Sequence, residues 1–178
     1  MRYLALLRGI NVGGKNKLPM KALKEIFAAN GCANIVTFIQ SGNVIFDAAA
    51  GKAGKLPAIL SAAIEAGAGL RIPVVLRTAA ELDAAVHSNP FLKAGADEDK
   101  LHIMFLADQP DSAAVAKLDP DRSPPDAFAV VGREIYLHTP NGVGNSRLTN
   151  AWFDSRLSTI GTSRNWRTCL KLNELMKS

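Results

Sequence analysis

Residues 34–46 read NIVTFIQSGNVIF and predict a β-hairpin at the centre of the fold. Residues 34–40 alternate, with Ile35, Thr37 and Ile39 on one face of a strand and the residues between them on the other. Ser41-Gly42 is a tight-turn signal, and residues 44–46 continue as the returning strand. The hairpin therefore supplies two neighbouring antiparallel strands around which the rest of the first half is arranged.

The elements expected on either side of this hairpin complete a recognisable order. Residues 2–9 read as a buried strand, and a helix begins near Pro19 and stops at Asn30-Gly31. A second helix starts at Leu56 and ends near residues 67–69, and residues 72–77 form a fourth strand. The order over residues 2–77 is β-α-β-β-α-β, which is the arrangement of a ferredoxin-like plait.

The second half repeats this order imperfectly. We expect a helix at 79–87, a loop at 88–99, a strand at 101–106, a short helix at 112–118 and a hairpin of strands 128–131 and 134–138. Ser146 then caps one helix, and Ser163 caps a last one where a fourth strand would close the sheet. We therefore predict an α+β fold of two ferredoxin-like plaits in tandem, residues 1–78 and 79–178, the second imperfect and ending in C-terminal helices.

Charge is spread unevenly along the 178 residues, whose formal net charge is +5. Residues 1–80 carry 10 Lys and Arg against 3 Asp and Glu, residues 81–144 carry 5 against 11, and residues 145–178 carry 6 against 2. Such asymmetry concerns binding partners more than fold. It indicates either a basic face built from both ends of the chain or chance clustering on a solvated surface.

The cellular setting follows from cysteine usage and hydropathy. No run of about 18 apolar residues is present, and the start lacks the apolar core and cleavage site of a signal peptide. Two cysteines, Cys32 and Cys169, suit reduced, buried thiols. We therefore expect a cytoplasmic protein without a membrane partner.

A glycine-rich basic loop follows the first strand and is the first candidate binding site. Gly9, Gly14 and Lys15 match all but the last position of a P-loop, whose backbone N–H groups and lysine cradle phosphate. Asn16 replaces the hydroxyl residue that would hold Mg²⁺, the helix starts late, at Pro19, and the next two strands form a hairpin. These departures argue against nucleotide hydrolysis and leave two interpretations, anion binding and a structural turn.

A second candidate lies near the C-terminus, at residues 161–168. A helix start next to Arg164 and Asn165 would offer free N–H groups and a cation to an anion, with Trp166 as a wall. The alternative is structural, because Ser163 is a good cap, Trp166 suits a helix core, and Arg164 could pair with the acidic middle of the chain.

The hairpin tip provides a third candidate, Asn43. In a plait this tip lies at the same end of the sheet as the glycine-rich loop, so Asn43 could face that loop; asparagine is also simply a good turn residue. No metal site is expected, because His87, His102 and His138 are scattered and the two cysteines lie far apart. No nucleophile motif is present and no cofactor is indicated, so whether the protein is an enzyme stays open.

Three segments together resemble the signature of one uncharacterised bacterial family, domain of unknown function 1697. They are Leu6 to Gly14, Gln40 to Val44, and Arg164 to Thr168 with Lys171-Leu172. The resemblance covers nearly the whole chain and implies two ferredoxin-like α/β plaits. It implies no activity, and Cys169 stands where a small aliphatic residue is expected.

Three functions remain open from the sequence. The preferred one is binding of a small anionic ligand that bears phosphate or carboxylate, with an unidentified reaction if there is any. The residues expected to contact it are Arg8, Asn11, Gly13, Gly14, Lys15, Lys17, Asn43, Arg164, Asn165 and Trp166. The second is nucleic-acid binding through a basic plait surface, with Tyr3 and Phe46 on suitable strands. The third is a structural or protein-interaction module.

Overall fold

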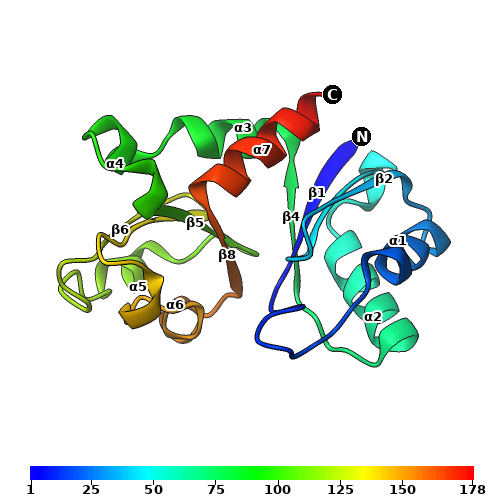
Figure 1. The fold of residues 1–178 in the computed structure, drawn as a ribbon, viewed down its shortest axis with the longest axis horizontal. Coiled ribbons are helices and arrows are strands. Elements are labelled where there is room, and N and C mark those ends of the chain that lie inside the picture. Colours follow the sequence, from blue (N-terminus) through cyan, green and yellow to red (C-terminus); the bar gives the residue numbers. More distant parts are fainter. The chain divides into compact units, whose positions relative to one another are not determined.

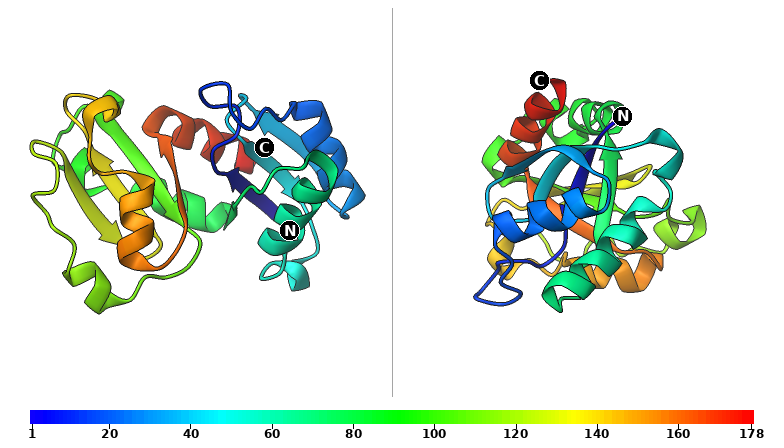
Figure 2. Two further views of the ribbon diagram at one scale, coloured as in Figure 1. Left: turned by 90° about the horizontal axis from the view of Figure 1, so that it is seen from below. Right: turned by 90° about the vertical axis from the view of Figure 1, so that its right-hand side faces the viewer.

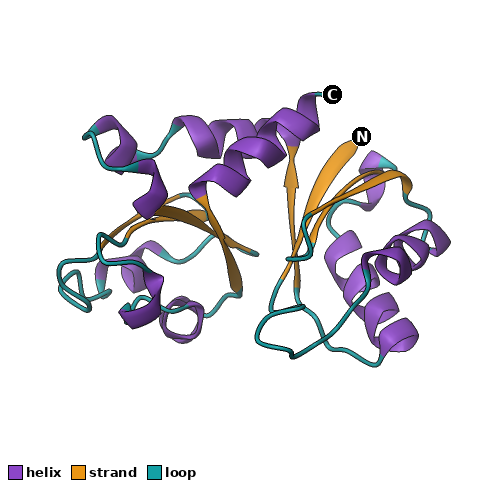
Figure 3. Ribbon diagram, in the orientation of Figure 1, coloured by secondary structure: helices purple, strands orange, loops and turns teal.

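The computed structural model describes residues 1–178, Lys52 by its backbone alone, and they form a mixed α+β structure (Figures 1 and 3). The chain divides into two compact units. Unit 1 holds Met1–Leu82 together with Glu174–Ser178, and unit 2 holds Asp83–Asn173. Each unit contains one four-stranded sheet in which all paired strands are antiparallel.

Unit 1 contains the predicted hairpin. Its elements are β1 (Arg2–Leu7), α1 (Met20–Ala29), β2 (Ala33–Phe38), β3 (Asn43–Asp47), the 3₁₀ turn Ala50–Lys52, α2 (Leu56–Ala68), β4 (Val74–Thr78) and the first part of α3 (Ala79–His87). The sheet order is β2-β3-β1-β4, so β3 lies between β1 and β2 and is antiparallel to both. The hairpin prediction is confirmed, and β1 is central because it pairs with β3 and with β4.

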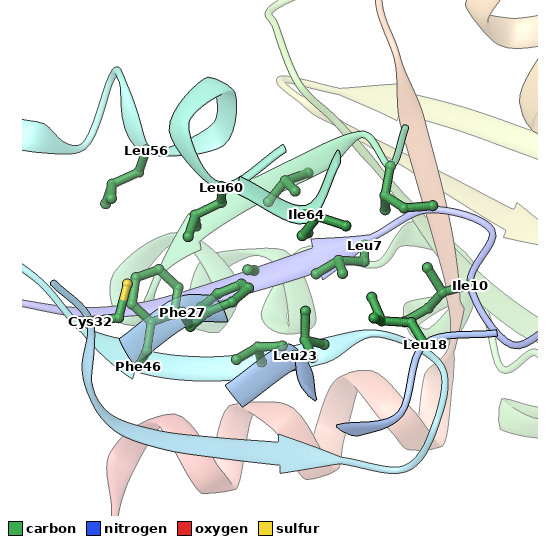
Figure 4. Packing of buried hydrophobic residues seen from close by; sticks show 14 of the residues in the cluster. Leu7, Ile10, Leu18, Leu23, Phe27, Cys32, Phe46, Leu56, Leu60 and Ile64 are labelled. Carbon is green, nitrogen blue, oxygen red and sulfur yellow. The ribbon is translucent and has the colours of Figure 1, made fainter. Parts of the chain in front are cut away.

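The core of unit 1 lies between one face of this sheet and the two helices α1 and α2 (Figures 2 and 4). Strand β1 contributes Tyr3, Ala5 and Leu7 to it, at the spacing of two that places side chains on one face. Helix α1 contributes Leu23 and Phe27, four residues apart on one side of the helix. Buried apolar area of this kind supplies most of the stabilisation that holds a sheet and its helices together.

Unit 2 repeats the β-α-β-β-α-β order of strands and helices of unit 1, with additional helices before its first strand and after its last one. After the second part of α3 come α4 (Pro90–Lys93), the 3₁₀ turn Glu98–Lys100, β5 (Leu101–Leu106), α5 (Ser112–Ala116), β6 (Ala127–Val131), β7 (Glu134–His138), the 3₁₀ turn Val143–Asn145, α6 (Asn150–Leu157), β8 (Gly161–Asn165) and α7 (Trp166–Lys177), whose last residues belong to unit 1. The sheet order β6-β7-β5-β8 repeats that of unit 1 position by position. Figure 3 shows α5 and α6 against one face of this sheet.

The predicted helix start at Ser163 is wrong. Residues Gly161–Asn165 form β8, which pairs with β5 and supplies the fourth strand that the sequence left out. Ser163 lies within that strand opposite Met104, and α7 begins at Trp166. The residue that caps α7 is Asn165, whose Oδ1 accepts a hydrogen bond from the backbone N–H of Thr168 at 2.8 Å.

Two smaller expectations also fail in unit 2. Thr149, and not Ser146, caps α6, because its Oγ1 accepts from the N–H of Trp152 at 3.2 Å. The expected loop at 88–99 contains α4, whose first turn is capped by the side chain of Asn89.

Across the described residues, no helix combines the length and apolar character that a membrane span requires.

Candidate functional site

The glycine-rich loop, residues 8–18, joins β1 to α1 in unit 1. Figure 2 shows it in dark blue beyond the end of β1. Ile10 and Leu18, one near each end of the loop, are each only 1% exposed and belong to the core of unit 1 (Figure 4). The loop is therefore anchored at both ends by apolar side chains, while Gly13, Gly14, Lys15 and Lys17 between them are exposed.

The glycines of this loop close a tight turn. The N–H of Lys15 donates to the carbonyl of Val12 at 3.0 Å, and Gly13 and Gly14 at the two central positions have φ of 57° and 75°. Two successive positive φ values are what a type I′ turn requires, and glycine adopts them without the steric cost of a Cβ. The turn is the tip of a small hairpin, because the N–H of Asn11 donates to the carbonyl of Asn16 at 3.1 Å.

Two asparagines hold the hairpin in place. Asn11 and Asn16 both adopt left-handed backbone conformations, with φ of 53° and 49°. The Asn11 amide donates to the carbonyls of Leu18 at 3.0 Å and Gln40 at 2.9 Å, and its Oδ1 accepts from the N–H of Leu18 at 2.9 Å. Asn16 donates to the carbonyl of Gly9 at 2.8 Å. These side-chain bonds replace the regular backbone pairing that a loop lacks.

Asn43 lies in β3 directly after the turn that the loop contacts. It is fully buried, and its Nδ2 donates to the carbonyl of Phe38 at 3.1 Å and to Ser41 Oγ at 2.9 Å. The Asn11–Gln40 bond joins the loop to this turn, and so does the bond from the N–H of Leu7 to the carbonyl of Gly42 at 2.8 Å. The structure thus brings the loop and the hairpin tip together, with the Asn43 amide engaged in shaping the tip.

The cations of the loop differ in their surroundings. Arg8 is half-buried, and its backbone N–H donates to the carbonyl of Pro73 at 3.1 Å. Lys15 and Lys17 are exposed, and in the part of the chain that the structure describes neither ammonium takes part in an ion pair. Two unpaired ammonium groups on an anchored loop create a local positive potential that an anion can neutralise.

The other three predicted residues belong to unit 2, at the junction of β8 and α7. Arg164 is 8% exposed and its Nη1 donates to Thr162 Oγ1 at 2.9 Å and to the carbonyl of Ser163 at 2.8 Å. Asn165 is exposed and caps α7. Trp166 is 1% exposed, and its Nε1–H has no hydrogen-bond partner among the described residues.

Burial dominates the electrostatics of this junction. It lowers the pKa of the Arg164 guanidinium to about 10, an effect that the nearby Cys169 opposes. The same burial raises the pKa of the Cys169 thiol to about 12, against the opposing influence of Arg164 and of backbone hydrogen bonds. At neutral pH the arginine is therefore charged and the thiol is protonated, so Cys169 is not an activated nucleophile.

Arg77 is a residue that sequence reasoning missed. It is the fourth residue of β4 and lies opposite Leu4, as Arg164 is the fourth residue of β8 and lies opposite Ile103. Arg77 is 1% exposed, and its Nη1 donates to the carbonyl of the preceding residue at 2.7 Å, the same contact that Arg164 makes. The sequence signal that could have identified Arg77 is an arginine followed directly by a helix-capping residue, a pattern that occurs at the end of both β4 and β8.

The glycine-rich loop does not form a metal-dependent P-loop. Helix α1 begins at Met20, after Leu18 and Pro19, and the turn at 12–15 is closed on itself, so the helix start does not continue from the glycines as a phosphate cradle does. Among the described residues, no three His, Cys, Asp or Glu side chains cluster in a way that could hold a metal ion.

Comparison with known protein families identifies the family of this chain. A family model described as a protein of unknown function, DUF1697, matches residues 1–136. The chain belongs to this family. The family resemblance is thereby confirmed, and the matched residues include the glycine-rich loop and the hairpin tip. The third segment that carried the resemblance, residues 164–172, lies outside the matched range. Membership of DUF1697 assigns no activity.

A solved structure shares the fold of this DUF1697 chain. It is that of the conserved bacterial protein SP0830 from Streptococcus pneumoniae, which is 22% identical, with a TM-score of 0.78 over 99% of this chain and 98% of that one. A search of curated proteins finds no match to the chain.

Proposed function

We propose that the loop of unit 1 binds a small anionic ligand that bears phosphate or carboxylate. The observation that carries this proposal is the charge of the first 24 residues, which hold Arg2, Arg8, Lys15, Lys17, Lys21 and Lys24 and no acidic residue. Lys15 and Lys17 present their ammonium groups from an anchored loop, and lysine is a common phosphate ligand because it acts as a point charge.

The loop residues divide into contacting and positioning roles under this proposal. Lys15 and Lys17 contact the anion, and Arg8 adds positive charge at the start of the loop. Gly13 and Gly14 allow the backbone N–H groups at the exposed tip to approach the ligand. Asn11 and Asn43 hold the tip and the adjoining turn in shape, since both side chains already donate to protein groups. A ligand would therefore meet a preorganised surface.

We keep Arg164, Asn165 and Trp166 as a second anion-binding group in unit 2. Asn165 is the accessible member, because it is exposed. Its Oδ1 is used by the helix cap, but its Nδ2 donates to no protein group among the described residues. Arg164 and Trp166 are buried and would act by shaping the backbone around it.

We further infer that both units are ferredoxin-like plaits and that the protein works in the cytoplasm. The order β-α-β-β-α-β, with strand order β2-β3-β1-β4 in one unit and β6-β7-β5-β8 in the other, supports the plait assignment. The free, buried thiols of Cys32 and Cys169 support a reducing compartment.

Titration of the protein with inorganic phosphate, citrate and ATP, followed by amide chemical shifts, tests the proposed function. We expect shifts at Gly13, Gly14 and Lys15, and a Kd about tenfold higher in the double variant Lys15→Gln/Lys17→Gln, since about 1.4 kcal/mol is tenfold in affinity. The matched control is Lys55→Gln/Lys117→Gln, which removes two exposed lysines elsewhere. Shifts confined to other regions, or equal losses in both double variants, would exclude the loop.

A further inference from the structure

A row of four exposed lysines runs from the loop into the first helix. Lys15 and Lys17 lie in the loop, and Lys21 and Lys24 lie three residues apart on α1. Residues three apart are neighbours on a helix surface, and Leu23 and Phe27 on the same helix turn into the core. In the described part of the chain, none of the four ammonium groups takes part in an ion pair or a side-chain hydrogen bond.

The charge belongs to unit 1 as a whole. Unit 1 carries 11 Lys and Arg against 5 Asp and Glu, a net charge of +6, whereas unit 2 carries 10 against 11, a net charge of −1. Glu25, directly after Lys24, is the first acidic residue of the chain. Four cations spread over a loop and a helix exceed what one small anion needs, and they suit a ligand with several anionic groups in succession.

Unit 1 has only one aromatic side chain that is not fully buried, Phe38 on β2, and so offers little surface for stacking bases. Tyr3 and Phe46, on the two strands from which stacking would be expected, are 1% and 0% exposed and contact one another in the core at a ring-centroid distance of 5.8 Å. Phe27 is also in that core, and Phe38 is half-buried. No aromatic residue is among the exposed large hydrophobic residues of unit 1, which are Met1, Val12, Val36, Ile39 and Ile59. Single-stranded nucleic acid is usually held by stacking on aromatics, whereas a duplex already stacks its own bases.

We propose that the lysine row of unit 1 binds the phosphodiester backbone of double-stranded nucleic acid, without contact to base edges. Lys15, Lys17, Lys21 and Lys24 would each neutralise a phosphate. This inference rests on the proposed function, because it names the class of anion that the same loop accepts. It replaces stacking on the sheet, the mode that sequence alone suggested, with a purely electrostatic one.

Fluorescence anisotropy of a labelled DNA duplex of mixed sequence, measured between about 50 and about 200 mM salt, tests the inference. Four phosphate contacts predict a slope of log K against log salt of about −3.6. The variant Lys21→Gln/Lys24→Gln should reduce that slope by about 2 and raise the Kd by about tenfold at the higher salt concentration. Lys55→Gln/Lys117→Gln is again the control and should leave the slope unchanged.

A duplex of RNA and a single strand of DNA, each of the same length, complete the panel. Equal binding of the DNA and RNA duplexes supports recognition of the phosphodiester backbone. Tighter binding of the RNA duplex supports the same recognition and identifies double-stranded RNA as the ligand. Tighter binding of the single strand, absence of binding at low salt, or a slope that Lys21→Gln/Lys24→Gln leaves unchanged would overturn the inference. If phosphate still shifts the amides of Gly13 and Lys15 while the duplex does not bind, the inference fails and small-anion binding stands. If neither probe acts at the loop, both proposals fail.

Discussion

At the scale of single residues, Gly42 shows how closely the hairpin tip is fitted to the loop. Its φ is +79°, and a Cβ added there would lie 2.7 Å from Leu7 Cβ and 3.0 Å from Ile10 Cδ1. Leu7 and Ile10 are core residues that cannot move aside freely (Figure 4). Gly13 has a similar positive φ of +57° but no atom within 4 Å of the same position. Substitution of Gly13 therefore tests backbone strain alone, whereas substitution of Gly42 tests backbone strain together with overpacking.

We predict that Gly42→Ala lowers the free energy of unfolding by roughly 2–4 kcal/mol, the sum of left-handed strain and overpacking. Gly13→Ala should cost only about 1 kcal/mol, since strain alone acts there. Chemical denaturation of both variants measures the difference. Equal losses would mean that the tip relaxes around the new methyl group.

The thiol of Cys169 provides a residue-scale pH prediction. Burial raises its pKa in the folded chain to about 12 from an unfolded value of 9.0, and burial also raises the pKa of Cys32. Below pH 9 the thiol is protonated in both states and its contribution is complete. Above pH 9 the unfolded chain loses the proton first, so stability falls by up to about 1.4 kcal/mol per pH unit.

Denaturation between pH 9 and 10 is the measurement, with Cys169→Ala as the comparison. The wild type should lose stability more steeply than the variant, by a difference that rises from about half a proton at pH 9 towards one proton at pH 10. The window ends at pH 10 because burial lowers the pKa of Arg164 to about 10. Above that pH the folded chain loses the guanidinium proton before the unfolded chain does, which changes stability with pH in the opposite direction. Parallel slopes for the two proteins would contradict the prediction.

At the scale of elements, β8 and the start of α7 carry the next prediction. The Asn165 cap satisfies the N–H of Thr168, so Asn165→Ala should lower stability by about 1 kcal/mol and speed hydrogen exchange at that amide. Ser163→Ala should leave exchange at Thr168 unchanged, because the Ser163 hydroxyl donates instead to Asn150 Oδ1 at 2.7 Å. Asn165→Asp keeps a capping oxygen and should restore protection. Faster exchange in Ser163→Ala would reinstate Ser163 as the cap.

The same region explains why β8 escapes sequence reasoning while other strands do not. The hairpins of β2 with β3 and of β6 with β7 carry apolar alternation and turn residues, and both were predicted close to their observed ends. The buried positions of β8 are Gly161, Thr162 and Arg164, so burial there leaves no hydrophobic alternation to read. Its buried arginine is accommodated by hydrogen bonds, which only the folded structure reveals.

A capping signal that sequence does carry lies at the equivalent end of β4. Thr78 and Glu81 form a capping box, in which the N–H of Thr78 donates to Glu81 Oε2 at 2.8 Å and the N–H of Glu81 donates to Thr78 Oγ1 at 3.3 Å. Recognition of this box and of Asn165 as parallel caps would have revealed Arg77 and Arg164 as counterparts. In the candidate site, the sequence identified the glycines, the lysines and Asn11, but it did not reveal the positioning role of Asn11, which includes a bond to Gln40, 29 residues along the chain.

At the scale of the whole molecule, the end of the chain belongs to the unit that the start builds. Glu174–Ser178 form part of unit 1, where Arg2 Nη2 donates to the carbonyl of Leu175 at 3.2 Å and Met176 is 3% exposed. Strand β1 is central in the unit 1 sheet, so contacts at its first residue bear on the whole sheet. The stability of unit 1 therefore depends on Glu174–Ser178, which lie far along the sequence from the rest of that unit.

Deletion of residues 174–178 should lower the free energy of unfolding by roughly 2–4 kcal/mol, chiefly through loss of the buried Met176 side chain. Hydrogen exchange should then rise at the β1 amides of unit 1 more than at the β5 amides of unit 2, because the lost contacts belong to unit 1. Deletion of Ser178 alone is the control and should be nearly neutral, since that residue is exposed and its hydroxyl bonds only the carbonyl of Leu175. A larger rise in exchange at β5 than at β1 would show that the C-terminal turn supports unit 2 instead.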